Sequence, residues 1–395
     1  MRMRRITPAD TRPPAATRRL VISDLHFGSG DKLAHHPLAL ERLAPELAWA
    51  DELLVNGDLF ELVFGPLHVA VERSRPFFEL VNSTVATVRF IPGNHDHHFV
   101  SLASDERRLA AITGDDPGPA FRVPPAEKVL RALCPDAAIV TNYPVTTLDG
   151  VTFHHGHYIG PHVESFGLRM LDRLSWQLTG SQRPDKLGVA DYEALQAPLL
   201  ELMYEMANLP QGVRAQQNFE RWLVGAGAWM RAPTKASRQV TGLAAGLLRR
   251  TPSELHENPE LPGEQARAAM TAVCANLDFA PGSVCFGHTH APLGDARSAD
   301  GSARWRLFNS GSWMWDRRLR EHPHYRATSW PGTVLRVCGG DIELVGLLAD
   351  LGERELSAMV PGAPPLGLQR PRRAAGRGRL AALRAPAQAI SPSRR

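Results

Sequence analysis

The sequence predicts an α/β fold that contains two β-sheets and a long helical insertion. Three observations support this prediction. Apolar, strand-like runs alternate with helical patterns in the opening part of the chain, which favours parallel strands joined by right-handed crossovers. Short strands then follow one another closely, as in a second sheet. Between Gly160 and about Asp278 the strand signal disappears, and apolar residues recur at helical spacing.

The opening part of the chain has the order β-α-β-α-β. Buried strands are expected at 19–23, 52–56 and 87–91. Helices are expected between them, at 38–49 and 69–82, because apolar residues there recur near helical spacing. Ligands of such sheets bind beyond the carboxyl ends of the strands. The residues that follow each strand are therefore the first candidates for a site.

The elements that follow are shorter. Residues 99–137 predict helix and loop, with a Pro- and Gly-rich break at 114–125, and Asp149-Gly150 is typical of a hairpin turn. Further strands are expected at 138–141, 145–148, 151–154, 283–287, 304–308, 333–337 and 342–347. Five parts result: a disordered lead-in (1–18), a first core part (19–159), a helical insertion (160–278), a second core part (279–355) and a disordered tail rich in Arg, Pro and Ala (356–395).

The composition is that of an ordinary globular protein, with 43% hydrophobic and 22% charged residues among 395. No apolar run approaches the roughly 20 residues that span a bilayer. The first twenty residues lack the apolar core of a secretory signal, so we expect a cytoplasmic protein. The four cysteines show no C-x-x-C spacing, and we expect them to be reduced and buried.

The basic charge of the chain comes from its end. Eight arginines and no acid lie between Leu368 and Arg395, so the formal charge of +4 for the whole chain becomes −4 without them. Such a tail is usually a solvated terminus, although it could also contact an anionic membrane surface or nucleic acid. A body with a charge near −4 does not favour a duplex-binding face.

Five predicted strands end in residues that bind metals or transfer protons. Each motif alone is more often a simple turn at a strand end, but five in one chain favour a single metal site. The motifs are Asp24-Leu25-His26, Gly57-Asp58, Gly93-Asn94-His95-Asp96, His155-Gly156-His157 and Gly287-His288-Thr289-His290.

These side chains suit a centre of two divalent ions, which lie about 3.5–4 Å apart in phosphoester hydrolases. Such a pair needs a bridging carboxylate, and Asp58 is the candidate. A mixture of carboxylate, amide and imidazole ligands favours Mn, with Fe, Zn or Co as alternatives. The other candidate ligands are Asp24, His26, Asn94, His155, His288 and His290. We expect His95 to be the catalytic acid, Asp96 to orient or tune it, and His157 to line the substrate cleft.

Together these motifs resemble the five ordered motifs of the calcineurin-like metallophosphoesterases, over roughly 19–160 and 280–347. The resemblance implies two facing sheets flanked by helices, a four-layer α-β-β-α sandwich. It implies that Asp24, His26, Asp58 and His290 hold one ion, that Asp58, Asn94, His155 and His288 hold the other, and that His95 is the acid. Glu61, in Gly57-Asp58-x-x-Glu61, resembles the branch of UDP-2,3-diacylglucosamine pyrophosphatases. That branch tends to carry Arg and Asp where this chain has His95 and His157.

The leading hypothesis is a metal-dependent phosphoesterase, in which a metal-bound hydroxide attacks a phosphomonoester, phosphodiester or pyrophosphate. The expected partner is a small phosphorylated substrate, either nucleotide-sugar or lipid-linked. The alternatives are a metal-binding scaffold of the same fold and a nuclease. The insertion is either a stabilising bundle or a lid over the site. Its tryptophans (Trp176, Trp222 and Trp229) could accept a lipid tail or a membrane surface, although apolar residues at helical spacing are more often core.

Overall fold

The computed structural model leaves out residues at both ends of the chain and five internal segments. The described residues are 16–29, 32–112, 121–162, 184–209, 264–315 and 329–360. Of the predicted insertion, the structure therefore describes only the two ends and one long helix. The predictions for Trp176, Trp222 and Trp229, and for most of the tail, lie outside the described residues.

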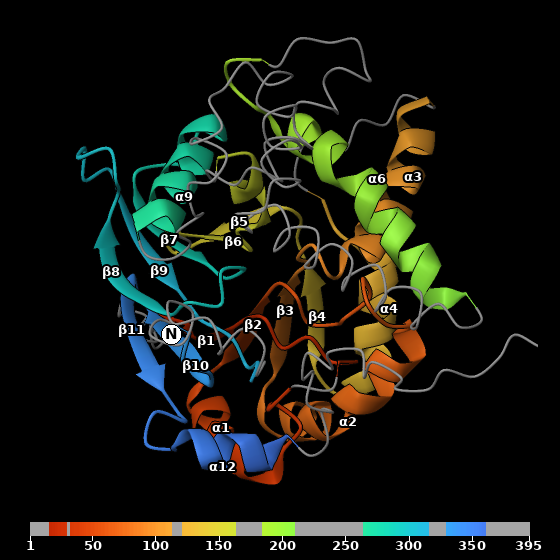
Figure 1. The fold of residues 1–395 in the computed structure, drawn as a ribbon, viewed down its shortest axis with the longest axis vertical. Coiled ribbons are helices and arrows are strands. Elements are labelled where there is room, and N and C mark those ends of the chain that lie inside the picture. The colour runs from red at the N-terminus through yellow and green to blue at the C-terminus, as the bar shows by residue number, and fades with distance from the viewer. Residues whose placement is uncertain are drawn as a thin grey trace, which may run out of the picture. The chain divides into compact units, whose positions relative to one another are not determined.

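The strands are β1 (Arg18–Ile22), β2 (Glu52–Asn56), β3 (Thr87–Ile91), β4 (Ala138–Thr141), β5 (Val145–Leu148), β6 (Val151–His154), β7 (Gly282–Phe286), β8 (Leu293–Arg297), β9 (Trp305–Asn309), β10 (Thr333–Cys338) and β11 (Asp341–Gly346). The helices are α1 (Pro37–Trp49), α2 (Leu67–Thr84), α3 (His97–Ile112), α4 (Pro124–Leu133), the 3-10 helix η1 (His157–His162), α6 (Val189–Asn208), α9 (Glu264–Asn276) and α12 (Glu353–Met359). Figure 1 shows their arrangement.

The strands form two sheets. The first has the order β11-β10-β1-β2-β3-β4, and the second has the order β5-β6-β7-β9-β8. Strands β1 to β4 run parallel to one another, while β10 and β11 extend this sheet in antiparallel fashion. In the second sheet β6, β7 and β9 are parallel. Parallel strands end at the same sheet edge, so each sheet places its post-strand loops together.

Alternation along the strands divides the core into layers, because successive side chains of a strand point to opposite faces. Val21 of β1 packs in a cluster with Phe153 of β6 and Cys285 of β7, which lie in the other sheet. Leu20 and Ile22 instead join a cluster with residues of α1, α2, α4 and α12. The outer side of the second sheet packs against α9 and η1. The predicted α/β fold with two sheets and flanking helices is confirmed.

Two elements differ from the sequence prediction. Helix α12 continues to Met359, beyond the expected start of the tail at residue 356, because Leu356 and Met359 are buried in the core beside the first sheet. Strand β8 was not predicted, since its sequence Leu-Gly-Asp-Ala-Arg carries no apolar pattern. It forms through pairing with β9 at the edge of the second sheet. Within the described ranges, no helix is long and apolar enough to cross a membrane.

Candidate metal centre

The loops after five strands meet at one place. Asp24 and His26 follow β1, Asp58 follows β2, and backbone hydrogen bonds join these two loops: Asp24 N donates to Gly57 O at 3.0 Å and His26 N to Asp58 O at 2.8 Å. In the second sheet, Gly287 N donates to His155 O at 2.7 Å. His288 N then donates to the carboxylate of Asp24 at 3.1 Å, which connects the two sheets at the site.

The backbone is strained where the candidate ligands lie. Five of them, none a glycine, have positive φ angles, a conformation that is uncommon for L-residues and clusters at functional sites. The residues are Asp24 (54°), His26 (46°), Asp58 (52°), His288 (66°) and His290 (58°). Each of these side chains is therefore turned into the site by a backbone that an isolated loop would not favour.

Two motif glycines leave room for the ligands. A Cβ at Gly57, whose φ is 91°, would lie 2.0 Å from His155 Nδ1, and a Cβ at Gly93 would lie 2.2 Å from Asp58 Oδ1. Both separations are far shorter than a van der Waals contact. Glycine at these positions thus lets the Asp58 carboxylate and the His155 imidazole approach the backbone closely.

The potential ligand atoms form overlapping groups whose members lie within 4.8 Å of one another. Asp58 Oδ2 lies 3.1 Å from His155 Nε2 and 3.6 Å from His26 Nε2, so this carboxylate stands between the groups. The groups are Asp24-His26-His290, His26-Asp58-His95 and Asp58-His155-His288. The first and third groups share no residue, and Asp58 of the third also lies close to His26 of the first.

The hydrogen bonds of His155 leave one of its nitrogens directed at the centre. Its Nδ1 lies 2.8 Å from Asn56 O, to which it donates, so Nε2 faces Asp58 Oδ2 without a hydrogen bond among the described residues. Burial lowers the pKa of His155, but Asp58 outweighs this effect and raises the pKa to about 9. The pair therefore favours a positive charge between its two atoms. Asn94 Oδ1 is also buried and accepts no hydrogen bond from a described residue.

His26 shows the same arrangement. Its Nδ1 lies 3.1 Å from Glu61 Oε2, which fixes the proton there. Its Nε2 consequently faces His290 Nε2 at only 3.3 Å. Two imidazole nitrogens at this distance need either a hydrogen or a cation between them, because two facing lone pairs repel each other. Together with the unpaired atoms of His155 and Asn94, this contact indicates that the side chains fit divalent metal ions.

The carboxylates of the centre are ionised. Burial raises the pKa of Asp58, but the neighbouring imidazoles His155 and His95 outweigh burial and hold the pKa well below its ordinary value. The pKa of Asp24 is lowered in the same way, mainly by His290. Burial lowers the pKa of His288 to about 3, so this imidazole is neutral and offers a lone pair. These charge states are those that metal ligands require.

Glu61 has a role that the sequence reasoning missed. Its Oε1 lies 2.6 Å from His95 Nδ1, and its Oε2 contacts His26, so one carboxylate holds both imidazoles. Burial lowers the pKa of His95, but Glu61 and Asp58 raise it to about 9. The signal in the sequence was the acid three residues after Asp58, which the sequence analysis gave only as a resemblance to one branch of the family.

Asp96, which is expected to orient or tune His95, binds backbone N–H groups of two loops. Its carboxylate accepts hydrogen bonds from Leu59 N at 3.1 Å, Phe60 N at 2.8 Å and Gly93 N at 3.0 Å. Asp96 therefore joins the loops after β2 and β3, and its role toward His95 stays a prediction. Glu61 is the carboxylate whose oxygen contacts His95 Nδ1.

His157, which was expected to line the cleft, is buried, with 4% of its surface exposed. Its Nε2 lies 3.2 Å from the Tyr143 hydroxyl, and its ring stacks on His154. This position does not favour direct contact with a substrate. His154, which was expected in the core, is fully buried and accepts a hydrogen bond from Gly156 N.

Asn309 and Ser23 form hydrogen bonds with the loops and side chains of the candidate ligands. Asn309 Nδ2 donates to Gly287 O at 2.8 Å and to the Thr289 hydroxyl at 3.0 Å, which shapes the loop that carries His288 and His290. Ser23 Oγ donates to Asp24 Oδ2 at 2.5 Å. Such partners orient metal ligands and are often needed for full metal affinity.

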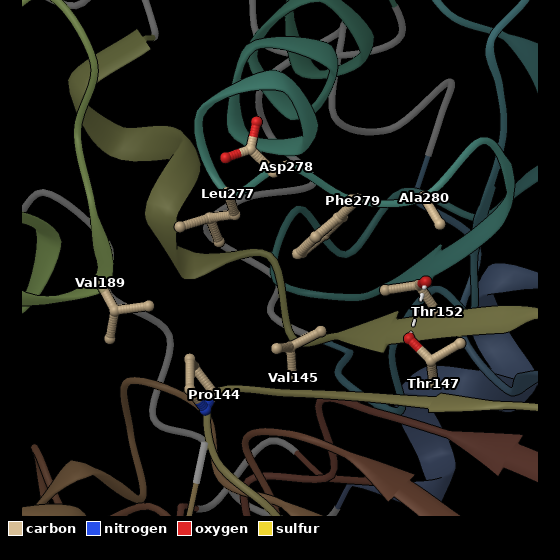
Figure 2. Close-up of a pocket in the computed structure, with 9 residues that line it drawn as sticks. All are labelled: Pro144, Val145, Thr147, Thr152, Val189, Leu277, Asp278, Phe279 and Ala280. Carbon is tan, nitrogen blue, oxygen red and sulfur yellow. Dashed lines mark hydrogen bonds between the residues drawn. The ribbon is translucent and has the colours of Figure 1, made fainter. Parts of the chain in front are cut away.

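A separate cavity of about 230 Å³ lies beside strand β5 and the end of α9 (Figure 2). It is mainly apolar, with Val145, Leu277 and Phe279 on its walls and a Thr147–Thr152 hydrogen bond of 3.1 Å at one side. None of its lining residues is a candidate ligand, so this cavity is distinct from the metal centre.

The sequence matches one protein family. Residues 17–194 fit the family described as "Calcineurin-like phosphoesterase", and this range contains the first four of the five motifs. No curated protein is similar enough in sequence to match.

Solved structures of metallophosphoesterases resemble the chain at low sequence identity. A phosphopantetheinyl hydrolase from Mycobacterium tuberculosis is 16% identical, with 82% of this chain and 96% of that chain covered and a TM-score of 0.30. A metallophosphoesterase from Sphaerobacter thermophilus is 14% identical, with coverages of 87% and 98% and a TM-score of 0.27. A dimetal phosphatase from Danio rerio is 10% identical, with coverages of 84% and 99% and a TM-score of 0.31.

Proposed function

We propose that the centre of this chain, residues 17–194 of which fit the calcineurin-like phosphoesterase family, hydrolyses a small phosphorylated substrate with two divalent ions. The observation that carries the proposal is the strained backbone at five candidate ligands from three different loops. Strain of this kind persists only where the surrounding structure enforces it, and it is concentrated at working sites.

The candidate ligands divide between two ions. Asp24, His26 and His290 would hold one, His155, His288 and Asn94 the other, and Asp58 would bridge them. The groups of nearby ligand atoms support this division. The mixture of carboxylate, amide and imidazole favours Mn, with Fe, Zn or Co as alternatives. When bound, the ions would activate water and offset the charge on the phosphoryl oxygens.

His95 would act on the leaving group. Its Nδ1 donates to Glu61, and the raised pKa keeps the imidazole protonated at neutral pH. The Nε2 hydrogen then remains available for a phosphoryl or leaving-group oxygen. Since 18% of the His95 side chain is exposed, a substrate can reach it, whereas Asp58 is almost completely buried. General acid catalysis of this kind contributes about 10²–10⁴-fold.

The test is hydrolysis, in the presence of Mn²⁺, of a generic phosphomonoester, a generic phosphodiester and a nucleotide-sugar pyrophosphate. Asp58→Asn should abolish turnover because it removes the charged bridge. His95→Ala should slow turnover by about 10²–10⁴-fold while metals remain bound. Asp350→Asn is the matched control, since that carboxylate is 65% exposed and pairs with Arg42 at the surface.

Turnover that vanishes with Asp58→Asn but not with Asp350→Asn would support the proposal, and the preferred substrate would identify the bond that is cleaved. Equal rates for the wild type and Asp58→Asn with every substrate would refute it.

A further inference from the structure

Helix α6 attaches to the core through charged and aromatic contacts at one end of α3 (Figure 1). Glu193 Oε2 accepts from His97 Nε2 at 2.8 Å, and Glu201 Oε2 accepts from His98 Nδ1 at 3.1 Å. The His98 ring also stacks on Tyr204, with centroids 3.5 Å apart and planes within 11°. α6 belongs to the part of the chain that the sequence identified as an insertion.

Glu193 makes the most connected of these contacts. Its other oxygen, Oε1, accepts hydrogen bonds from the hydroxyls of Tyr158, at 2.5 Å, and Tyr143. Burial raises the pKa of Glu193, but His97 outweighs this effect and lowers it, so the carboxylate is ionised. One carboxylate thus contacts three elements: α3, η1 and the segment between β4 and β5.

These contacts continue to the metal centre along two routes. His97 is the first residue of α3, and its backbone N–H donates to Asn94 O at 3.4 Å, within the loop that carries His95. On the other route, the Tyr143 hydroxyl lies 3.2 Å from His157 Nε2, and the His157 ring lies 5.5 Å from that of His155.

We propose that Glu193 is a positioning residue, through which the inserted helix fixes the Asn94–His95 loop for catalysis. The inference rests on the proposed function. His97 keeps only 3% of its side chain exposed, so its ring has little room to move while Glu193 holds it. Hydrogen bonds to an ionised acceptor are shorter and stronger than neutral ones, and the carboxylate is the only group that accepts from His97 Nε2 among the described residues.

The decisive variant is Glu193→Gln, which preserves the shape of the side chain but removes its charge and one acceptor oxygen. Glu205→Gln is the matched control, because Glu205 lies on the same helix with its side chain exposed. We expect Glu193→Gln to lower kcat about tenfold or more with little change in KM. We also expect its affinity for Mn²⁺, measured by calorimetry, to fall by up to about tenfold, which is the low end of the loss for direct partners of metal ligands, because Glu193 reaches Asn94 only through His97. Glu205→Gln should match the wild type in both.

A double-mutant cycle separates positioning from general destabilisation. In the His95→Ala background, Glu193→Gln should have almost no further effect on kcat, because the residue through which it acts is gone. A tenfold loss of kcat on Glu193→Gln in both the wild-type and the His95→Ala background would overturn the proposal. So would unchanged kcat and unchanged Mn²⁺ affinity in a variant that only melts at a lower temperature.

The same experiment distinguishes the two proposals. If the wild type hydrolyses none of the three substrates, the proposed function fails, and the Mn²⁺ titrations of Glu193→Gln and Glu205→Gln still decide whether Glu193 organises the centre. If the wild type is active and Glu193→Gln equals it in both measurements, the inference about Glu193 alone fails.

Discussion

Replacement of Glu61 by Gln tests how His95, the proposed acid, is positioned. The Glu61 carboxylate contacts His95 Nδ1 at 2.6 Å, His26 Nδ1 at 3.1 Å and Phe64 N at 3.2 Å. An amide has one acceptor oxygen and no charge, so at least one imidazole must lose its partner. The side chain is 4% exposed, and water cannot easily take the place of the missing oxygen.

The size of the effect follows from the hydrogen bond that is lost. A hydrogen bond to a charged group contributes about 1.5–3 kcal/mol, and each 1.36 kcal/mol of barrier changes a rate about tenfold. We therefore expect Glu61→Gln to lower kcat by about 10–150-fold. The loss should be larger for a substrate with a poor leaving group than for an activated ester, because only the poor leaving group needs the proton from His95.

The assay is steady-state kinetics over a range of Mn²⁺ concentrations with both kinds of substrate. His26 also contacts Glu61, so metal affinity should fall as well, and saturating Mn²⁺ removes this part of the effect. Glu72→Gln is the control, since Glu72 pairs with Arg75 at the surface. A kcat for Glu61→Gln within twofold of the wild type, with saturating metal and a poor leaving group, would refute the positioning of His95 by Glu61.

Three further predictions concern glycine, pH and thiols. Gly93→Ala should lose most of its turnover in a standard assay, because its Cβ would lie 2.2 Å from Asp58 Oδ1. Although burial raises the pKa of Glu127, Arg122 lowers it overall. Its stabilising contribution is thus present above pH about 4.5 and lost in more acidic solution, and urea unfolding should show less acid sensitivity in Glu127→Gln. A thiol reagent at pH 8 should modify Cys338 first, because the other three cysteines are buried and burial raises their pKa.

The sequence predicted many of the strands well because each is a short run rich in apolar and β-branched residues, and two of them, β2 and β6, are buried throughout. Residues 52–56 and 87–91 begin and end as expected, and so do 138–141, 145–148 and 151–154. Strand β8 could not be predicted in this way, since its pairing with β9, and not its own composition, makes it a strand. Helix α12 depends likewise on distant partners, because its two buried side chains pack against elements from the start of the chain.

The candidate ligands could be predicted because each lies directly after a strand, and parallel strands bring such positions together. The residues that position the proposed acid and its loop could not be predicted from the sequence. Glu61 contacts His95 across 34 positions in sequence, and Glu193 contacts His97 across 96. Nothing in the local sequence of Glu193 separates it from a solvated acid on an ordinary helix. Only the packing of α6 against α3, η1 and the segment between β4 and β5 gives this carboxylate its partners.

Removal of the metal ions should lower the stability of the fold, because the ions would bind between side chains that face one another at the centre. His155 Nε2 faces Asp58 Oδ2 at 3.1 Å, and His26 Nε2 faces His290 Nε2 at 3.3 Å. Strained positive φ angles at such residues cost about 1–3 kcal/mol each. A ligand that binds the native state alone stabilises it by about 2.7 kcal/mol at 100 times its Kd, so Mn²⁺ should raise the melting temperature and a chelator should reverse the change.

Asp58→Asn separates this metal effect from general stability. The substitution removes the buried negative charge that pairs with His155 and His95, so the metal-free variant should melt below the metal-free wild type. The bridging charge is also gone, so added Mn²⁺ should stabilise the variant much less than the wild type. Thermal unfolding of the wild type and of Asp58→Asn, each with Mn²⁺ and with chelator, gives the four melting temperatures that the comparison needs. An equal rise with Mn²⁺ in both proteins would place the stabilising ions elsewhere, and the assignment of Asp58 as the bridge would be wrong.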